Sequence, residues 1–267
     1  MLEVPRAALR AHWPEYGIEA LGLGLFMMAA VAGTVLLEHP ASPLHRALPD
    51  AFLRRALMGV AMGTTAIALV YSPLGQRSGA HFNPAFTFAF FRLGKVAPAD
   101  AFFYALAQFT GAVVGVAVIG AALGATAADP VVRFAATLPG ASEWIAFAAE
   151  VAISFFLMAT VLVASNTPRL ERFTGLFAGA LVALYITFEA PVSGMSMNPA
   201  RSFGSATGAG VFASIWIYFL APPIGMLLAA ELFVRLRGAR AVQCAKLNHQ
   251  TNQRCIFRCT RPMEPAR

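Results

Sequence analysis

Six long apolar runs constrain the fold of this chain more than any other feature of its sequence. They cover about residues 17–37, 56–71, 101–123, 144–165, 174–190 and 213–234. An α-helix needs roughly 20 apolar residues to cross a bilayer core, and none of the runs alternates apolar and polar residues as a membrane strand does. Because 58% of the 267 residues are hydrophobic and only 12% are charged, a water-soluble fold would expose a large apolar surface. The sequence therefore predicts an all-α membrane protein with six transmembrane helices.

The distribution of basic residues predicts the orientation of these helices. An even number of spans places both ends of the chain on one side, and most of the 20 lysines and arginines lie there. The exceptions are Arg46, Arg54, Arg55, Arg133 and Arg201. Cytoplasmic loops carry the excess of Lys and Arg, so we expect both termini in the cytoplasm and the protein in the cell (inner or plasma) membrane. The first dozen residues show no signal-peptide cleavage pattern, so the first span is expected to stay as an anchor, and the net charge of +7 reflects topology rather than nucleic-acid binding.

A duplicated motif divides the chain into two halves. The pattern S-G-x-x-x-N-P-A begins at Ser78 and again, 115 positions later, at Ser193. Each half also carries a glutamate early in its first span, at Glu19 and at Glu150. Each half has three spans, an odd number, so the second half must be inverted relative to the first. We predict repeats at about 15–125 and 143–237, a membrane channel domain over 1–237 and a cytoplasmic Cys/His-containing basic tail over 238–267.

The two Asn-Pro-Ala sequences are typical helix starts. Asparagine caps the free N–H groups of a first turn, and proline fits that turn because its missing N–H is not needed there. The apolar segments that follow, Phe86–Leu93 and Ser202–Ala213, are too short to cross a bilayer and are predicted to be half-helices. Non-helical backbone at membrane depth is tolerated where it lines a cavity or is buried in protein. The Ser-Gly loops thus indicate a water-filled pore, in which two positive helix ends face each other.

With these features the chain resembles the aquaporins, the major intrinsic protein family, over about Glu19 to Val234. The resemblance rests on S-G-A-H-F-N-P-A, on S-G-M-S-M-N-P-A-R-S, on the two glutamates and on Gln108. It implies a right-handed bundle of six helices and two half-helices, a homotetramer with one pore per subunit, and passive flow of water and small uncharged solutes with protons and ions excluded. We expect a bacterial-type member with a non-standard selectivity filter, without a cofactor.

The resemblance also assigns roles to individual residues. Asn83 and Asn198 would present their amide NH₂ groups to the pore, and Arg201 would stand at its narrowest point. Glu19 and Glu150 would brace the two loops, although membrane-embedded carboxylates can also couple transport to protons or ions. Main-chain carbonyls would form an acceptor ladder along the pore. The motif and ladder residues are Asn83, Pro84, Ala85, Asn198, Pro199 and Ala200, with Gly79, Ala80, His81, Phe82, Gly194, Met195 and Ser196.

The expected selectivity filter departs from that of a strict water channel. Its fifth-span position lies 12 residues before Asn198, at Ile186, and its loop position three before, at Met195. The second-span position, 20 before Asn83, is Gly63, or Met62 if the loop has one extra residue. Water-selective members usually carry His at the first position and Phe at the last. We therefore expect a wider or more apolar constriction, for which glycerol, urea and undissociated metalloid acids are candidates.

The tail contains a set of residues that could bind zinc. Cys244, His249, Cys255 and Cys259 form a zinc-compatible Cys₃His set. Their spacing matches no strong zinc module, so we expect a basic, partly disordered tail without a metal, with zinc binding as the alternative.

Two other functions remain open at this stage. A secondary transporter of a small neutral solute also uses inverted repeats and broken helices, and a junctional or scaffolding protein could use the same fold. We expect no enzyme, since the sequence has no nucleophile–base pairing, no phosphate-binding glycine loop and no zinc-protease histidine pair.

Overall fold

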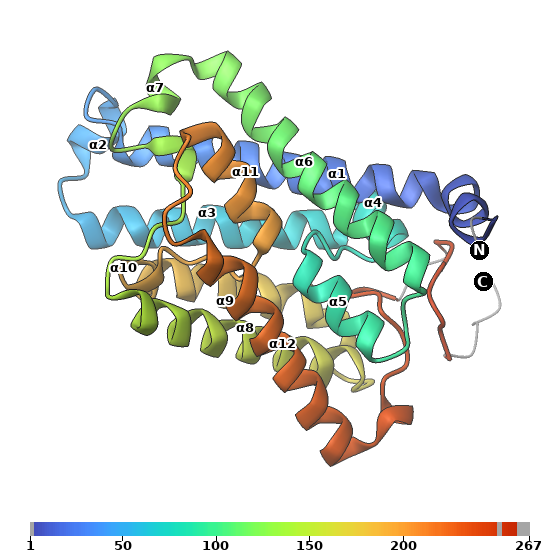
Figure 1. The fold of residues 1–267 in the computed structure, drawn as a ribbon. Coiled ribbons are helices and arrows are strands. Elements are labelled where there is room, and N and C mark those ends of the chain that lie inside the picture. The colour runs from blue at the N-terminus through green and yellow to red at the C-terminus, as the bar shows by residue number, and fades with distance from the viewer. Residues whose placement is uncertain (1–2, 250–252, 261–267) are drawn as a thin grey trace.

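Six long helices form the body of the protein (Figure 1). The computed structural model describes residues 3–249 and 253–260, and in this part of the chain it shows helices and no strands. All six are long and apolar enough to cross a membrane, as the sequence predicts. They are α1 (Glu3–Glu38), α3 (Ala51–Tyr71), α6 (Pro98–Leu123), α8 (Glu143–Ser165), α9 (Thr174–Phe188) and α12 (Ile215–Arg237). The span that contains α9 includes the turn before it and runs over Glu171–Phe188.

Short helices connect these long ones and shape the loops. The α-helical elements are α2 (Pro43–Ala47), α4 (Pro73–Ser78), α7 (Ala125–Ala128) and α10 (Ala190–Ser193). The 3₁₀ turns are η1 (Arg133–Ala135), η2 (Glu171–Phe173) and η3 (Ala239–Ala241). Helices α4 and α10 occupy matching places in the two halves, since each ends with the serine that opens a Ser-Gly motif.

The long helices pack in a pattern that repeats between the halves. Helix α1 packs along α6 in the first half, and α8 packs along α12 in the second. The middle helices, α3 and α9, pack along each other and join the halves. This pairing is the one that an inverted repeat requires, because the first and third helix of each half meet and the second helices meet across the axis.

Glycines allow the closest of these helix contacts. A Cβ atom at Gly63 of α3 would lie 2.5 Å from the carbonyl oxygen of Gly179 in α9. Cβ atoms at Gly111 and Gly115 of α6 would meet the backbone of α1. Small residues let membrane helices approach until their backbones touch, and these glycines allow that approach between α3 and α9 and between α1 and α6.

The two half-helices start at the prolines of the repeated motif. Helix α5 (Pro84–Arg92) lies toward the end of the bundle where α1 begins, and α11 (Pro199–Ala209) lies toward the opposite end (Figure 1). Helix α11 is shorter than predicted, because Gly210 takes a left-handed conformation with φ of 66° and its N–H donates to the Ala206 carbonyl. A left-handed residue of this kind ends a helix, and glycine adopts it without strain. The predicted segment up to Ala213 therefore divides into a helix and a separate loop.

The described part of the tail packs against the bundle. Residues 250–252 and 261–267 lie outside the described residues, so the expectation of a partly disordered tail stays a prediction. Val242, Cys244, Leu247 and Phe257 are buried in the same apolar cluster as residues of α5 and α8. The sequence interpretation counted the tail's charges and overlooked these apolar side chains, which need a surface to cover them.

Candidate functional site

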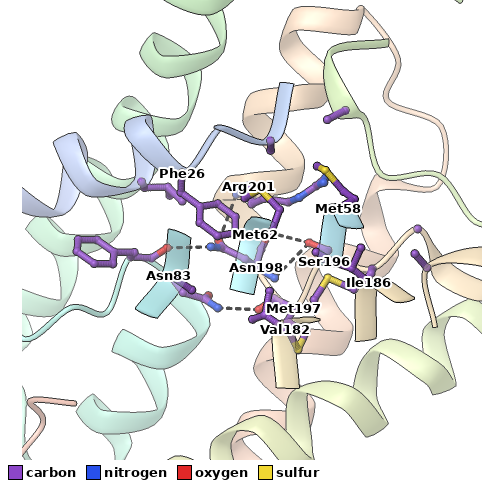
Figure 2. Close-up of a pocket in the computed structure, with 18 of the residues that line it drawn as sticks. Phe26, Met58, Met62, Asn83, Val182, Ile186, Ser196, Met197, Asn198 and Arg201 are labelled. Carbon is purple, nitrogen blue, oxygen red and sulfur yellow. Dashed lines mark hydrogen bonds between the residues drawn. The ribbon is translucent and has the colours of Figure 1, made fainter. Parts of the chain in front are cut away.

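A cavity of about 470 Å³ runs between the two halves of the bundle. Its walls come from α1, α3 and α9 and from the loops that precede α5 and α11. Asn83 and Asn198 both line it, and Figure 2 shows them side by side at its centre. The repeated motif therefore meets itself inside the cavity, although its copies lie 115 residues apart.

The two asparagines are joined by crossed hydrogen bonds. The Asn83 side-chain amide donates to the main-chain carbonyl of Met197 at 2.7 Å, and the Asn198 amide donates to the carbonyl of Phe82 at 2.8 Å. An amide NH₂ has two hydrogens, so each asparagine keeps a second N–H beside the cavity. The crossed bonds thus fix the direction of both amide groups.

Each asparagine also caps the helix that follows it. The Asn83 side-chain oxygen accepts from the N–H of Ala85 at 2.9 Å. The Asn198 oxygen accepts from Ala200 at 3.1 Å and from Arg201 at 3.2 Å. Capping occupies the oxygen, so the NH₂ group remains for the crossed bond and for the cavity. Both caps therefore present donors, and the positive ends of two helix dipoles, at the same point.

The loops before the asparagines hold strained backbone. Ala80 and Phe82 in the first loop have φ of 58° and 44°, and Met195 and Met197 in the second have 49° and 54°. Non-glycine residues avoid this left-handed region, at a cost of order 1–3 kcal/mol each. Such strain persists only where the surroundings fix the backbone firmly, which two buried glutamates do here.

Glu19 of α1 holds the first loop. One carboxylate oxygen accepts from the Ser78 hydroxyl at 2.7 Å and from the N–H of His81 at 3.1 Å. The other accepts from the N–H of Phe82 at 2.6 Å and from the Gln108 amide at 2.7 Å. This set satisfies loop N–H groups that water cannot reach in a membrane interior.

Glu150 of α8 repeats the arrangement on the second loop. It accepts from the Ser193 hydroxyl at 2.8 Å and from the N–H groups of Ser196 at 2.6 Å and Met197 at 2.8 Å. These three donors lie 115 positions after Ser78, His81 and Phe82. The correspondence extends the inverted repeat from the helices to single hydrogen bonds.

Two tyrosines complete the support of the loops and escaped the sequence analysis. The Tyr104 hydroxyl donates to the Ser78 carbonyl at 2.6 Å, and the Tyr218 hydroxyl donates to the Ser193 carbonyl. A signal was present in the sequence, because each tyrosine lies within the third span of its half. A polar aromatic residue inside an apolar span needs a partner for its hydroxyl group.

The structure separates the two alternatives for the second-span filter position. Met62 lines the cavity and is 2% exposed, whereas Gly63 faces α9 and is absent from the lining. Ile186, Met195 and Arg201 line the cavity with Met62. Because α3 is helical here, a shift of one residue turns the side chain by about 100° around the axis. Of the two residues, only Met62 is placed where a filter could use it.

Three further lining residues were not anticipated from the sequence. Phe26 of α1, Met58 of α3 and Val182 of α9 surround the same part of the cavity (Figure 2). Met58 and Val182 lie four residues before Met62 and Ile186, which places each pair on one helix face. That spacing was a readable signal. Phe26 had none, because its position depends on how α1 rotates against α6.

Arg201 brings a positive charge to the cavity wall. Its guanidinium has a long contact of 3.5 Å to the Ser205 hydroxyl. No carboxylate in the described ranges forms an ion pair with it. Its remaining N–H donors are therefore available to a molecule in the cavity.

Gly79 departs from its expected place in the carbonyl ladder. Its carbonyl accepts from the N–H of Leu247 in the tail at 3.1 Å, and Gly79 does not line the cavity. The six other ladder residues do line it: Ala80, His81, Phe82, Gly194, Met195 and Ser196. Neighbouring His81 also meets the tail, since its Nε2 lies 2.9 Å from the Ala245 carbonyl.

The Cys₃His residues of the tail come together in the structure. The ligand atoms of Cys244, His249, Cys255 and Cys259 all lie within 4.8 Å of one another. The hydrogen bond between the Cys244 and Cys255 thiols lowers the pKa of Cys255, and burial lowers the pKa of Lys246 beside them. The cluster lies outside the membrane-spanning helices and is separate from the motif residues.

The comparisons with known proteins agree with this geometry. Residues 9–233 match the family model described as "Major intrinsic protein". Aquaporin NIP2-3 of Zea mays is 36% identical over 192 residues, which cover 72% of this chain and 62% of that protein. Aquaporin NIP1-4 of Oryza sativa subsp. japonica is 37% identical over 186 residues, which cover 68% of this chain and 66% of that protein. The chain thus spans less than two thirds of the length of these plant relatives, and they give no support to the expected bacterial type.

A solved structure shows the same fold. The X-ray structure of the aquaglyceroporin from Plasmodium falciparum matches with a TM-score of 0.67 and 21% sequence identity. The match covers 86% of this chain and 98% of that one. At this identity the likeness concerns the fold alone.

Proposed function

Because the chain belongs to the major intrinsic protein family, we propose that its central cavity is the pore of a passive channel for water and small uncharged solutes. The observation that carries the proposal is the meeting of two capped helix starts inside the cavity, with an amide donor of each asparagine beside it. Relatives named aquaporins support the channel class.

The paired asparagines explain how such a pore would exclude protons. A water molecule that accepts from both amides has its oxygen fixed at the centre, between two positive helix ends. Its hydrogens then point away on both sides, so the chain of donors cannot run through in one direction. The same positive field repels cations, and Arg201 adds a second barrier at the filter.

We propose a filter made of Met62, Ile186, Met195 and Arg201, bordered by Phe26, Met58 and Val182. Three of its four members are apolar and two are methionines, which bend easily around a solute. Arg201 supplies the donors for a solute oxygen. This combination of one polar side and a flexible apolar side fits small neutral solutes with a carbon or metalloid centre, such as glycerol, urea or metalloid acids.

Three carboxylates of the membrane region, Glu19, Glu150 and Glu231, support a channel rather than a coupled transporter. The buried oxygens of Glu189, at the end of α9, have no hydrogen-bond partner among the described residues, but Glu189 does not line the cavity. Glu19 accepts four hydrogen bonds, three from the first loop and one from Gln108 of α6, and Glu150 accepts three from the second loop. Glu231 pairs with Arg92 at 2.7 Å near the helix ends. Coupling requires a carboxylate that can exchange a proton or ion during transport, and these three already have fixed partners.

We also propose cytoplasmic termini in a cell membrane and a homotetrameric assembly. The N-terminal helix, the tail and the Arg92/Lys95 loop lie at one end of the bundle, where the guanidinium of Arg254 donates to the Ala11 carbonyl and the N–H of Arg258 donates to the Lys95 carbonyl. This basic end is the one that the positive-inside rule places in the cytoplasm.

The tetramer follows from the family resemblance, and native mass spectrometry of the purified protein tests it. The repeat limits at 15–125 and 143–237, and the division at residue 237, remain predictions.

Uptake of radiolabelled glycerol into proteoliposomes tests the channel directly. A passive channel brings the internal concentration to that of the bath, at a rate above protein-free liposomes, with or without a proton or sodium gradient. Accumulation above the bath concentration in response to an ion gradient would instead establish the transporter.

A further inference from the structure

The C-terminal segment, residues 242–249 with 253–260, lies against the first pore loop. The N–H of Leu247 donates to the Gly79 carbonyl at 3.1 Å, and His81 Nε2 donates to the Ala245 carbonyl at 2.9 Å. The ring of Phe257 stacks on the His81 imidazole with centroids 5.2 Å apart. The segment therefore occupies a carbonyl and an imidazole nitrogen of the first pore loop, and of these two residues His81 lines the cavity.

Leu247 reaches into the cavity itself. It belongs to the cavity lining together with Ala80, His81 and Phe86, and it is 5% exposed. These neighbours belong to the first loop and to α5, which lie toward the end of the bundle where α1 begins (Figure 1). The segment thus stands at that end of the cavity, and Leu247 forms part of the wall there.

The segment consists of two arms that hold each other. The first arm covers residues 242–249 and the second covers 253–260. The buried Lys246 ammonium of the first arm donates to the carbonyls of Gln253 at 3.1 Å and Arg254 at 2.7 Å. The N–H of Thr260 donates to the Gln243 carbonyl at 2.9 Å. Each arm is also tied to the bundle, through Asn166 and through Lys95.

Each arm contributes two of the four residues that could bind a metal. Cys244 and His249 belong to the first arm, and Cys255 and Cys259 belong to the second. The Cys244 and Cys255 sulfurs lie 3.6 Å apart, and the Cys259 sulfur lies 3.2 Å from His249 Nε2. A bonded pair of sulfurs would be about 2.05 Å apart, and all three cysteines are free.

These separations fit one tetrahedral ion. With Zn–S of about 2.3 Å and Zn–N of about 2.0 Å, the edges between donors in a tetrahedron are about 3.5–3.8 Å. The observed distances need changes of only a few tenths of an ångström in the two measured pairs. Three thiolates and one imidazole make a soft donor set, which favours zinc over calcium or magnesium.

We propose that Cys244, His249, Cys255 and Cys259 bind one divalent ion of the zinc type, and that this ion fastens the C-terminal segment across the end of the cavity and so restricts passage. The ion links the two arms at four points, which holds Leu247 and Phe257 against the first loop. The effect on passage rests on the proposed channel function, whereas the metal site stands without it.

Metal content of the full chain in detergent with a reductant tests the site. After loading with zinc and desalting, wild-type protein is expected to retain about one ion per chain, as a four-ligand structural site does. The Cys244→Ser/Cys255→Ser/Cys259→Ser variant is expected to lose this ion, and His249→Ala to lose most of it. His45→Ala, which changes a histidine bonded to Leu37 outside the cluster, is expected to retain it.

Cobalt substitution in wild-type protein gives a readout that needs no mutation. We expect thiolate-to-cobalt charge-transfer absorption together with tetrahedral ligand-field bands, both lost on adding zinc. Equal zinc content in the triple serine variant, or a cobalt spectrum without thiolate bands, would overturn the site.

Osmotic response of proteoliposomes tests the restriction. Liposomes that contain zinc-loaded wild-type protein are expected to shrink several-fold more slowly than liposomes that contain the same protein stripped with a chelator. Added zinc should restore the slow rate of shrinkage. Liposomes that contain the triple serine variant should shrink at the fast rate both after zinc loading and after chelator treatment. Equal rates for loaded and stripped wild-type protein, both above protein-free liposomes, would overturn the restriction alone. Shrinkage rates equal to those of protein-free liposomes in every sample would overturn the channel function. The metal content would then decide the metal site separately.

Discussion

The side-chain amide of Asn83 donates to the main-chain carbonyl of Met197 at 2.7 Å, and Asn198 makes the equivalent bond to Phe82 at 2.8 Å. A carbonyl of each half thereby fixes the direction of the asparagine amide of the other half, beside the cavity. With a single copy of the motif, the asparagine oxygen would still cap its helix, but the amide NH₂ would lack the carbonyl of the other half. The duplication therefore supplies both the second helix end and the contact that orients the first.

Replacing Asn83 with aspartate tests the role of the amide. Aspartate caps a helix as well as asparagine does, so the variant should fold, but it cannot donate and it adds negative charge between the helix ends. We expect proton leak to rise about tenfold, which corresponds to a barrier lowered by roughly 1.4 kcal/mol.

A pH-sensitive dye inside proteoliposomes measures this leak. Gln76→Glu is the matched control, because it makes the same amide-to-acid change at a side chain that bonds the Tyr71 carbonyl outside the cavity. An equal proton leak in both variants would show that the added negative charge causes the leak wherever it lies, and would contradict a special role of the Asn83 amide.

Glu150→Gln tests the support of the second loop. Glutamine replaces one acceptor oxygen with a donor, so at least one of the loop N–H groups of Ser196 and Met197 loses its partner. An unpaired buried donor costs about 1–3 kcal/mol, and we expect the thermal unfolding midpoint in detergent to fall. Glu231→Gln, which breaks the half-exposed pair with Arg92, should cost less than about 1 kcal/mol. Equal midpoints for the two variants would refute the bracing role.

The filter proposal predicts a change of selectivity in Met62→Phe/Ile186→His. The aromatic ring narrows the cavity and the imidazole adds a hydrogen-bonding group, so glycerol uptake should fall about tenfold while water flow persists, as expected for a cost of roughly 1.4 kcal/mol in the solute's barrier. Val60→Phe adds the same ring to α3 on an outward face that is 60% exposed, and should leave uptake unchanged. Unchanged glycerol uptake in the double variant would show that the filter lies elsewhere.

Gly63→Ala tests the packing of α3 on α9. The new methyl group would lie 2.5 Å from the Gly179 carbonyl oxygen, so the helices must move apart. We expect destabilisation of about 1–3 kcal/mol, in the range for overpacking. Gly17→Ala is the matched control, since its methyl group meets no atom within 4 Å and alanine favours the helix. Unfolding midpoints that fall equally in both variants would exclude the close contact as the cause.

Patterns that local chemistry determines could be read from the sequence. Apolar length predicts the six spans, and the odd number of spans in each half predicts inversion. Asn83 and Asn198 are helix caps whatever surrounds them. Glu19 and Glu150 stand out because a carboxylate in an apolar run needs several donors, and the loops provide them.

Features that depend on rotation and on long-range packing could not be read in the same way. The choice between Gly63 and Met62 depends on which face of α3 packs against α9. Counting back from Asn83 cannot make this choice, because one extra residue in the loop shifts the position by one. Phe26 lines the cavity only because α1 packs along α6. The tail was judged by its charges, and its contacts with Gly79 and His81 depend on a surface that the rest of the fold creates.

The central claim is that the cavity conducts water and small neutral solutes passively while it excludes protons. Stopped-flow light scattering on liposomes containing chelator-treated wild-type protein tests it most directly, with a proton-sensitive dye recorded in the same preparation. We predict faster shrinkage than in protein-free liposomes on exposure to an impermeant osmolyte, reswelling when glycerol replaces it, and an unchanged rate of proton leak. Shrinkage and reswelling no faster than in protein-free liposomes would contradict the account, as would a proton leak that rises with the water flow.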